Sequence, residues 1–395
     1  MQKIILFIFG LFRRFRLFWL KLINKTESDI HAERVVSGDS WDEFCENLKN
    51  AGAALVYPGT PRDPFQQAEG IRYLSRLTRA GLEAYVEYSN PSFPVLRRMV
   101  HETVKLGADN PDNHYLNAQI SGEYEYAITG KRNTIHYVGF FTQNGNYGTT
   151  GGLAPCGVLE HKDLKTDKNG NFEIILSKEP KSDNWLKIEE DTTLLMVRQT
   201  YLDRDNEQPI DVHIKNLDGR VHPDPLNPET LDKGLQTASL FIAGAPFLFA
   251  KWAKGFQKHM NKLPVFDPEV SNAAGGDAGI IYHHSYWKLN SDESLIIEVI
   301  PPECDTWNFQ LNNYWMESLD YRYYPISINM HSAILKKNGL VRVVIAHQDP
   351  GVENWLSTAG HTEGTMCWRW YRIHPGSEPV QPSCRVVKVN ELTQL

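Results

Sequence analysis

The stretch ISGEYEYAITGKRNTIHYVGFF, residues 120–141, carries the clearest strand signal in the chain. From Ile120 to Ile128, apolar and aromatic side chains alternate with polar ones, apart from one glycine. The segment GKRN at 130–133 has the composition of a turn and leads into a second apolar run at 135–141. Two alternating runs joined by a turn are typical of a β-hairpin. We therefore predict a hairpin over residues 120–141.

Further strand signals follow on both sides of a helical interruption. They lie at residues 172–177, 194–201, 280–289, 295–300, 306–311, 341–347 and 366–373. Short strands that recur between turns are typical of a β-sandwich or a jelly roll. The fold class predicted is mainly β with helical additions (α+β), with a first β-rich part at 107–222 and a C-terminal β-sandwich part at 266–395.

Two regions have helical periodicity instead. Residues 26–106 predict a helical layer, with a polar linker over 26–40 and helices over 41–49, 63–88 and 94–105. Residues 223–265 predict a helical insertion, whose helix over 230–260 is bent at Pro246. We interpret this helix as a buried cover on the sheet. A second membrane contact by residues 238–252 is the alternative.

The first 25 residues, MQKIILFIFGLFRRFRLFWLKLINK, form an amphipathic pattern at helical spacing. The uncharged run from Ile4 to Phe12 is too short to cross a bilayer, which needs about 20 apolar residues. Arginines interrupt the segment where a signal peptide stays apolar. We predict a helix that lies in the membrane interface; a helix that faces the protein core is the alternative. The membrane-binding side chains would be Phe12, Arg14, Phe15, Phe18, Trp19 and Lys21.

Charge and cysteine content agree with a peripheral position. The net charge is −7, although six of the first 25 residues are Lys or Arg, so a general nucleic-acid surface is not expected. The basic segment suits an anionic leaflet. Five scattered cysteines indicate a reducing compartment. We predict a monotopic protein on the cytoplasmic face of the inner membrane, with membrane lipids as partners and another membrane protein as a further candidate; the oligomeric state stays open.

Three C-terminal strings resemble a known bacterial family. They are PPECDTWNFQLNNYWMESLDYR at 301–322, AHQDPGVENWLSTAGH at 346–361 and TMCWRWYR at 365–372. Together they resemble the domain of unknown function 1214, which is often coupled to the one numbered 1254. The strings at 107–115 and 197–205 resemble segments that usually precede that domain. The resemblance covers roughly residues 40–385 and implies a β-rich, sandwich-like fold without implying any activity.

Three polar clusters are candidates for chemistry. Asp109 and Asp112 lie in an oxygen-rich loop, which can supply a general acid or base but is also a common turn former. Glu317, Asp320 and Arg322 lie among tyrosines. This pattern is typical of a cleft that binds a sugar or catalyses a reaction, and the alternative is an ion pair of Arg322 with Asp320 that only fixes a loop. His347 and His361 flank a turn and are suited to proton transfer, although most such histidines only bond the backbone. The predicted catalytic residues are Asp109, Asp112, Glu317, Asp320, His347 and His361.

Other side chains are candidates for substrate binding. A strand face containing Arg198 is otherwise apolar, so its charge must be paired or must face a ligand, and we expect Asp203 or Glu317 as the partner. The predicted substrate-binding residues are Arg198, Arg322, Tyr314, Tyr321 and Trp355. We assign no cofactor and no metal site, because no nucleotide-binding fingerprint is present and a metal cluster would have to be assembled from distant residues.

Two function hypotheses result. The first is an enzyme of the hydrolase or isomerase type that uses carboxylate and histidine acid–base chemistry on a lipid, isoprenoid, steroid or glycolipid. The second is a non-catalytic module that binds a lipid or sugar, or docks a membrane enzyme. Convergence of Glu317, His347 and Asp109 on one open pocket would favour the enzyme. Separate burial of each with its own partner would favour the binding module.

Overall fold

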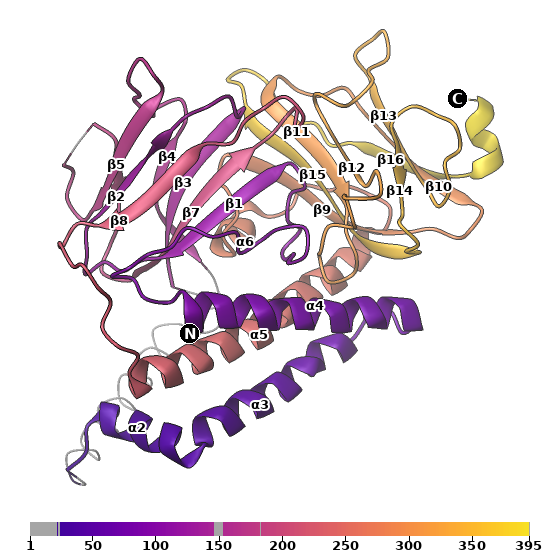
Figure 1. Ribbon diagram of the computed structural model, residues 1–395. Coiled ribbons are helices and arrows are strands. Elements are labelled where there is room, and N and C mark those ends of the chain that lie inside the picture. Colours follow the sequence, from indigo (N-terminus) through magenta and orange to yellow (C-terminus); the bar gives the residue numbers. More distant parts are fainter. Residues whose placement is uncertain (1–21, 23, 146–152, 182, 395) are drawn as a thin grey trace.

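The computed structural model describes residues 22, 24–145, 153–181 and 183–394. Two β-sandwiches lie side by side above a layer of helices (Figure 1). In the described residues, the strands form four sheets of four strands each. The predicted fold class, mainly β with helical additions, is confirmed. The segment predicted as a membrane-interface helix, 1–25, lies almost wholly outside the described residues.

The first sandwich holds the strands of the N-terminal half. One sheet has the order β1-β7-β3-β4, and the other has the order β6-β5-β2-β8. The bounds of the first sheet are β1 Asn113–Gln119, β7 Thr192–Thr200, β3 Tyr137–Asn144 and β4 Ala154–Glu160. Those of the second are β6 Trp185–Lys187, β5 Asn171–Ser177, β2 Tyr126–Lys131 and β8 Asp211–Asn216.

The second sandwich holds the C-terminal strands. Its sheets have the orders β12-β11-β15-β9 and β14-β13-β10-β16. The first consists of β12 Ser327–Asn329, β11 Cys304–Leu311, β15 Glu363–Ile373 and β9 Ile280–Lys288. The second consists of β14 Trp355–Ser357, β13 Val341–Ala346, β10 Glu293–Val299 and β16 Ser383–Lys388.

Each sandwich has its own apolar core, because alternate side chains of a strand point to opposite faces. In the second sandwich, Trp307, Trp368 and Trp370 pack against Ile297 and Val343 of the facing sheet. The residues between these tryptophans therefore point out of the sandwich. Most of the outward-facing residues on β9, β11 and β15 are polar and still buried, so this face is covered by the rest of the protein.

The helices form the cover on one side. They are α2 Glu27–Ser37, α3 Asp39–Ala51, α4 Pro64–Leu82 and α5 Pro228–Phe256, with shorter turns at η1 Gly52–Val56, η2 Glu83–Glu87 and η3 Gln257–His259. Helix α6 Pro268–Ala273 lies between the two sandwiches, and η4 Val389–Gln394 packs on β10 and β13 at the edge of the second sandwich (Figure 1). The long helix α5 begins at Asn227, whose side chain accepts from the Thr230 amide, followed by Pro228 at the first helical position. Its apolar face packs on α3, α4 and the second sandwich. No helix of the described residues is both long and apolar enough to span a bilayer.

Three local predictions are wrong. Strands β2 and β3 do not form a hairpin, because β2 pairs with β5 and β8 whereas β3 pairs with β4 and β7 in the opposite sheet. The predicted linker at 26–40 contains α2, which begins with a capping box between Thr26 and Asp29. The predicted helix at 94–105 is irregular, because Arg97 pairs with Asn117 of β1 through backbone hydrogen bonds.

Candidate functional site

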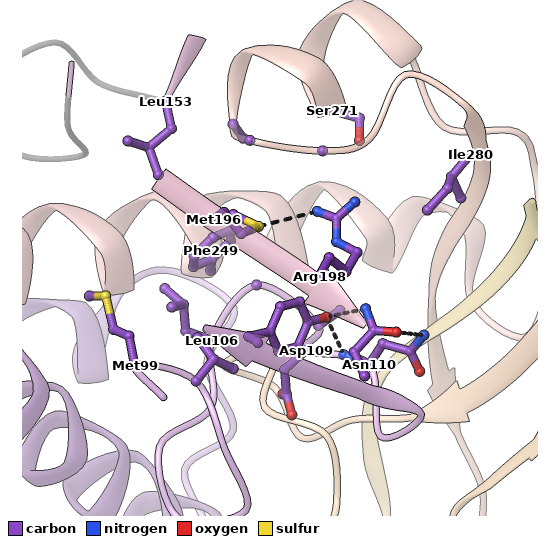
Figure 2. A pocket seen from close by; sticks show the side chains of 18 of the residues that line it. Met99, Leu106, Asp109, Asn110, Leu153, Met196, Arg198, Phe249, Ser271 and Ile280 are labelled. Atoms are coloured by element: carbon purple, nitrogen blue, oxygen red, sulfur yellow. Dashed lines mark hydrogen bonds between the residues drawn. The ribbon is translucent and has the colours of Figure 1, made fainter. Parts of the chain in front are cut away.

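A cavity of about 150 Å³ lies where the two sandwiches meet. We call it the junction cavity. The outward face of β1 and β7 forms one wall, and the outward face of β9 and β15 forms the other. Helix α5, the α6 region and the loop over residues 106–110 border it further, and the cavity stays partly open. Figure 2 shows the wall formed by β1 and β7.

Most of the junction cavity is apolar. Side chains from both sandwiches and from α5 contribute to this surface, and Figure 2 shows several of them around the central space. They are Met99, Leu106, Leu153, Leu194, Met196, Phe249, Trp252 and Ile280. Apolar walls with a few placed polar groups are typical of small-molecule sites in proteins.

Arg198 supplies one of the charged groups. Its Nη1 donates to Asp277 Oδ2 at 2.8 Å. Among the described residues, its Nη2 reaches only the Met196 sulfur, at 3.6 Å (Figure 2). A thioether is a weak acceptor, so this nitrogen is poorly satisfied. Burial alone would lower the pKa of Arg198, but the Asp277 carboxylate outweighs it and keeps the pKa above its usual value. The predicted pairing of Arg198 with Asp203 or Glu317 is therefore wrong.

Asp277 is shared between two arginines. Besides Arg198, it accepts from Arg372 Nη2 at 2.9 Å, and Arg372 also contacts Glu160. Burial would raise the pKa of Asp277, but Arg198 and Arg372 outweigh it, so its pKa lies below the usual range. Two guanidinium groups and two carboxylates thus compensate one another at this edge of the junction cavity.

Arg369 has no direct ion pair of this kind, and the carboxyl groups of Asp109 and Asp112 act on it only from a distance. It lines the junction cavity and is only 3% exposed. Its Nη1 donates to Gln310 Oε1 at 2.6 Å and to Asn308 Oδ1 at 3.4 Å, and its Nη2 donates to the Ala108 carbonyl oxygen. All these acceptors are neutral. No carboxylate of the described residues lies within 4.0 Å of its nitrogen atoms, and its Nε has no acceptor among them.

His284 lies next to Arg369 on the same face. Its ring stacks between Phe256 and Tyr282, at centroid distances of 5.6 and 5.4 Å. Burial, with the nearby Arg369 charge, lowers the pKa of His284 to about 3, so the ring is neutral at physiological pH. Its buried Nδ1 has no hydrogen-bond partner among the described residues. The junction cavity therefore combines apolar walls with incompletely satisfied nitrogen atoms.

Asp109 lines the junction cavity, but its carboxylate is engaged elsewhere. Oδ1 accepts from the Ser318 amide at 2.9 Å, and Oδ2 accepts from the Ser318 hydroxyl at 2.8 Å. Burial raises the pKa of Asp109. Asp112 is also buried, which raises its pKa, and it accepts from Asn308 Nδ2 at 3.1 Å. Both carboxyl groups hold the loop before β1 in place.

A second hollow, of about 300 Å³, lies between α4 and the loop over residues 313–324. We call it the polar cleft. It brings together three predicted catalytic residues, Glu317, Asp320 and His361. Glu317 accepts from Arg76 Nη1 at 2.7 Å, and burial raises its pKa against the effect of that arginine.

Asp320 and Arg322 form a bidentate ion pair at the rim of the polar cleft. Nε of Arg322 donates at 2.9 Å and Nη2 donates at 2.7 Å. These hydrogen bonds lower the pKa of Asp320. The ammonium nitrogen of Lys105 lies over the ring of Tyr321, 4.6 Å from the centroid of that ring. The expected ion pair of Arg322 with Asp320 is therefore present.

The other predicted residues lie away from both hollows. His347 bonds the Thr358 hydroxyl at 2.9 Å and the Asn290 carbonyl oxygen at 3.1 Å. Trp355 donates to the Ala346 carbonyl oxygen, and Tyr314 donates to that of Ala250 beneath α5. The expectation that all these groups gather at one open end of a sandwich is wrong. They occupy two separate hollows and several structural positions.

The sequence reasoning missed the central residues of the junction cavity. Arg369 was not singled out, and Asp277 was interpreted as part of a flexible loop. The period-two pattern of TMCWRWYR contained the signal, because tryptophans on both sides of Arg369 place it on the opposite face. No group of three or more potential metal ligands occurs in the part of the chain that the structure describes. The predicted membrane-binding residues lie outside that part.

Fold and site define a double β-sandwich protein with a buried cavity at the junction. Residues 153–202 match the family described as "Protein of unknown function (DUF1214)". The match lies upstream of the three C-terminal strings. The chain is also similar to an uncharacterized protein from Burkholderia cenocepacia, with 46% identity and a TM-score of 0.89 over 91% of this chain and 99% of that chain. The chain belongs to the DUF1214 family.

A second solved structure is more distant. The VPA0106 protein from Vibrio parahaemolyticus is 13% identical, with a TM-score of 0.44 over 87% of this chain and 100% of that chain. None of the curated proteins matches the chain.

Proposed function

We propose that this protein binds a small amphipathic anion, with a carboxylate head and an apolar body, in the junction cavity. The observation that carries the proposal is Arg369, a buried guanidinium that borders the cavity and has only neutral acceptors. Burying a charge without a counter-charge is unfavourable, so an anionic ligand would improve its environment. Arg198 Nη2, which reaches only a thioether, is a second donor for the same head group.

The apolar walls determine the rest of the ligand. At about 150 Å³, the junction cavity is comparable to an engineered apolar cavity in another protein that accepts benzene. A single aromatic ring matches this space, and a short chain can extend through the open side of the cavity, whereas a whole sterol does not fit. We choose 4-phenylbutanoate as the probe, because it combines one ring, a short chain and a carboxylate.

The partners of the predicted acid–base groups favour binding over catalysis. Glu317 is held by Arg76, Asp109 by Ser318 and His347 by Thr358 and a backbone carbonyl. They do not converge on one pocket. Groups that are engaged separately in this way support a binding or structural role more than acid–base catalysis.

We also propose that residues 1–25 attach this binding protein to an anionic membrane surface, where lipid-derived anions are produced. The support is the amphipathic and basic pattern of that segment. Flotation with vesicles containing phosphatidylglycerol should recover the full chain. A full-length variant with Phe15→Ser, Phe18→Ser and Trp19→Ser should stay in the dense fraction. Equal flotation of both proteins would overturn the membrane attachment without affecting the ligand proposal.

Thermal unfolding of the full chain tests the ligand proposal. Saturation with 4-phenylbutanoate should raise the Tm, because a ligand that binds only the folded state stabilises it by about 2.7 kcal/mol at a hundredfold excess over Kd. The matched alcohol, 4-phenylbutan-1-ol, should raise the Tm less, and 4-phenylbutylamine should not raise it.

A substitution that fills the junction cavity provides the matched comparison. Met196→Trp should abolish the response to 4-phenylbutanoate, whereas Val158→Trp, on an exposed position of β4, should retain it. Equal responses to acid, alcohol and amine, or an undiminished response in Met196→Trp, would contradict the proposal.

A further inference from the structure

The polar cleft differs from the junction cavity in its lining residues, its volume and its polarity. It is lined by Phe65 and other residues of α4, by Lys105, by the loop over 313–324 and by His361. None of these residues borders the junction cavity. Its volume of about 300 Å³ falls within the range of small-molecule sites. We therefore considered it independently of the proposed function.

The charges that line the polar cleft are balanced. Arg76 pairs with Glu317 at 2.7 Å, and Arg72 pairs with Glu69. Lys105 donates to the carbonyl oxygens of Ser318 and Leu319, and Asp320 is paired with Arg322. The lining residues themselves comprise three cations, Arg72, Arg76 and Lys105, and three carboxylates, Glu69, Glu317 and Asp320, whereas Arg322 lies outside the lining. Since these charges offset one another, the polar cleft does not favour a charged ligand. It offers a dense set of oriented donors and acceptors instead.

His361 provides an acceptor that the protein does not use. Gln66 donates from Nε2 to the Glu363 carbonyl oxygen, so its Oε1 accepts from His361 Nδ1 at 3.1 Å. The proton of the neutral ring therefore resides on Nδ1, and Nε2 carries a lone pair. Burial lowers the pKa of His361 to about 4, which keeps the ring neutral. The side chain is 4% exposed, and Nε2 has no partner among the described residues.

Aromatic side chains surround the entrance to the polar cleft. Tyr323 is 74% exposed, Tyr324 is 47% exposed and Phe65 is 43% exposed. Phe65 packs edge-on against the His361 ring at 4.7 Å, which fixes the position of the unused acceptor. Exposed rings beside planar amide, carboxylate and guanidinium groups suit a flat molecule with apolar faces and a polar rim.

We propose that the polar cleft binds a neutral, hydroxyl-rich molecule of the sugar class. The sugar ring stacks on Tyr323, the more exposed of the two tyrosines, and a ligand hydroxyl donates to His361 Nε2. Other hydroxyl groups bond the Arg76–Glu317 pair and the Asn313 side chain, which lie on the floor of the cleft. Balanced charge distinguishes this ligand class from sugar phosphates and uronic acids.

Saturation-transfer NMR and calorimetry on the full chain test this proposal. The neutral probes are methyl glucopyranoside, methyl galactopyranoside, cellobiose and maltose. The anionic probes are glucuronate and glucose 6-phosphate. At least one neutral probe should bind, and its affinity should exceed that of the anionic counterpart. Binding of the anionic probes alone, or of none of the six, would overturn the proposal.

Two variants locate the binding. Tyr323→Ala should weaken a neutral probe about fivefold through lost ring contact, and its exposed position leaves the fold intact. His361→Phe should weaken it about tenfold by removing the acceptor. Tyr88→Ala, at an exposed tyrosine outside the polar cleft, should have no effect. If Tyr323→Ala and His361→Phe bind the neutral probe as tightly as the wild type does, the assignment of the site is contradicted. The affinity for 4-phenylbutanoate should be unchanged in all of these variants.

Discussion

Arg369 donates a hydrogen bond from Nη2 to the carbonyl oxygen of Ala108, and this contact joins the second sandwich to the loop that precedes β1. Ala108 adopts a left-handed conformation with φ of 58°, and its amide donates to the Met316 carbonyl oxygen at 2.7 Å. A non-glycine residue rarely adopts this conformation without support from its surroundings. The loop is thus held on both sides while the guanidinium remains at the wall of the junction cavity.

The Asp277 substitution tests the charge network beside the cavity. Asp277→Asn should lower the free energy of unfolding by about 3–5 kcal/mol, because it leaves the buried Arg198 and Arg372 without their shared carboxylate. Chemical denaturation measures the change. Asp292→Asn is the matched control, since its ion pair with Lys388 is exposed to solvent and should contribute far less to stability. Similar losses in the two variants would contradict this account.

Two glycine substitutions test the packing of the helical layer. A Cβ at Gly70 of α4 would lie 2.5 Å from the fully buried ring of Trp315, whereas a Cβ at Gly255 of α5 meets no atom within 4 Å. Gly70→Ala should therefore destabilise the protein by about 1–3 kcal/mol through overpacking. Gly255→Ala should stabilise it by about 0.5–1 kcal/mol through helix propensity. Thermal unfolding that gives both variants the same sign would show that α4 is not packed as described.

The attachment of α2 to α5 should depend on pH. Asp232 of α5 accepts from His31 Nδ1 at 2.6 Å and from Arg34 Nε at 2.9 Å. Burial would raise the pKa of Asp232, but the hydrogen bonds from Arg34, Ser40 and His31 outweigh it and lower the pKa to about 2. A carboxyl group whose pKa is lowered in the folded state stabilises the protein at pH values above its unfolded-state pKa, near 3.8. This contribution is lost as the pH falls through the folded-state pKa.

Urea denaturation at several pH values checks this dependence. At pH 6, the free energy of unfolding of the wild type should exceed that of Asp232→Asn by at least about 2 kcal/mol. This difference is the contribution that corresponds to the lowered pKa of Asp232. The difference should shrink between pH 4 and pH 2, as Asp232 becomes protonated. A difference that stays constant across this range would mean that another property of the variant causes its instability.

The strands could be predicted from the sequence, but their partners could not. Only the end of the predicted strand, from Tyr126 onward, lies in β2, whereas the alternating residues 120–125 precede it, and the apolar run before Phe141 appears in β3. Alternation is the same whichever sheet a strand joins, so it does not identify the neighbour. The chain between β2 and β3 crosses to the other sheet. Long-range contacts hold it there, such as the hydrogen bond that the Ile135 amide donates to the Gln208 carbonyl oxygen.

The errors in the helical layer have different causes. The sequence Thr26-Glu27-Ser28-Asp29 already contained the capping signal of α2, which we interpreted as part of a polar linker. Over residues 94–105, spacing alone favoured a helix. The backbone of Arg97 instead pairs with Asn117, a residue 20 positions further along the chain, and local periodicity holds no information on that contact.

The candidate site was predictable only where its residues are close in sequence. Glu317, Asp320 and Arg322 were grouped correctly because they occupy one loop. Arg198 was assigned the wrong partner, since the 79 residues that separate it from Asp277 include a whole helix. The junction cavity forms between the outward faces of two sandwiches, and a single sequence does not specify how those faces meet.

The preference of the protein for a carboxylate over the matched alcohol tests the central claim most directly. Calorimetry should give 4-phenylbutanoate an affinity at least about tenfold above that of 4-phenylbutan-1-ol, because hydrogen bonds to charged groups contribute about 1.5–3 kcal/mol. Arg369→Gln should bring this ratio markedly closer to one with little change in the affinity for the alcohol, since Arg198 remains as a second donor, while Arg72→Gln, in the polar cleft, should preserve it. The same ratio in wild type and Arg369→Gln would contradict the claim that this buried arginine makes the junction cavity an anion-binding site.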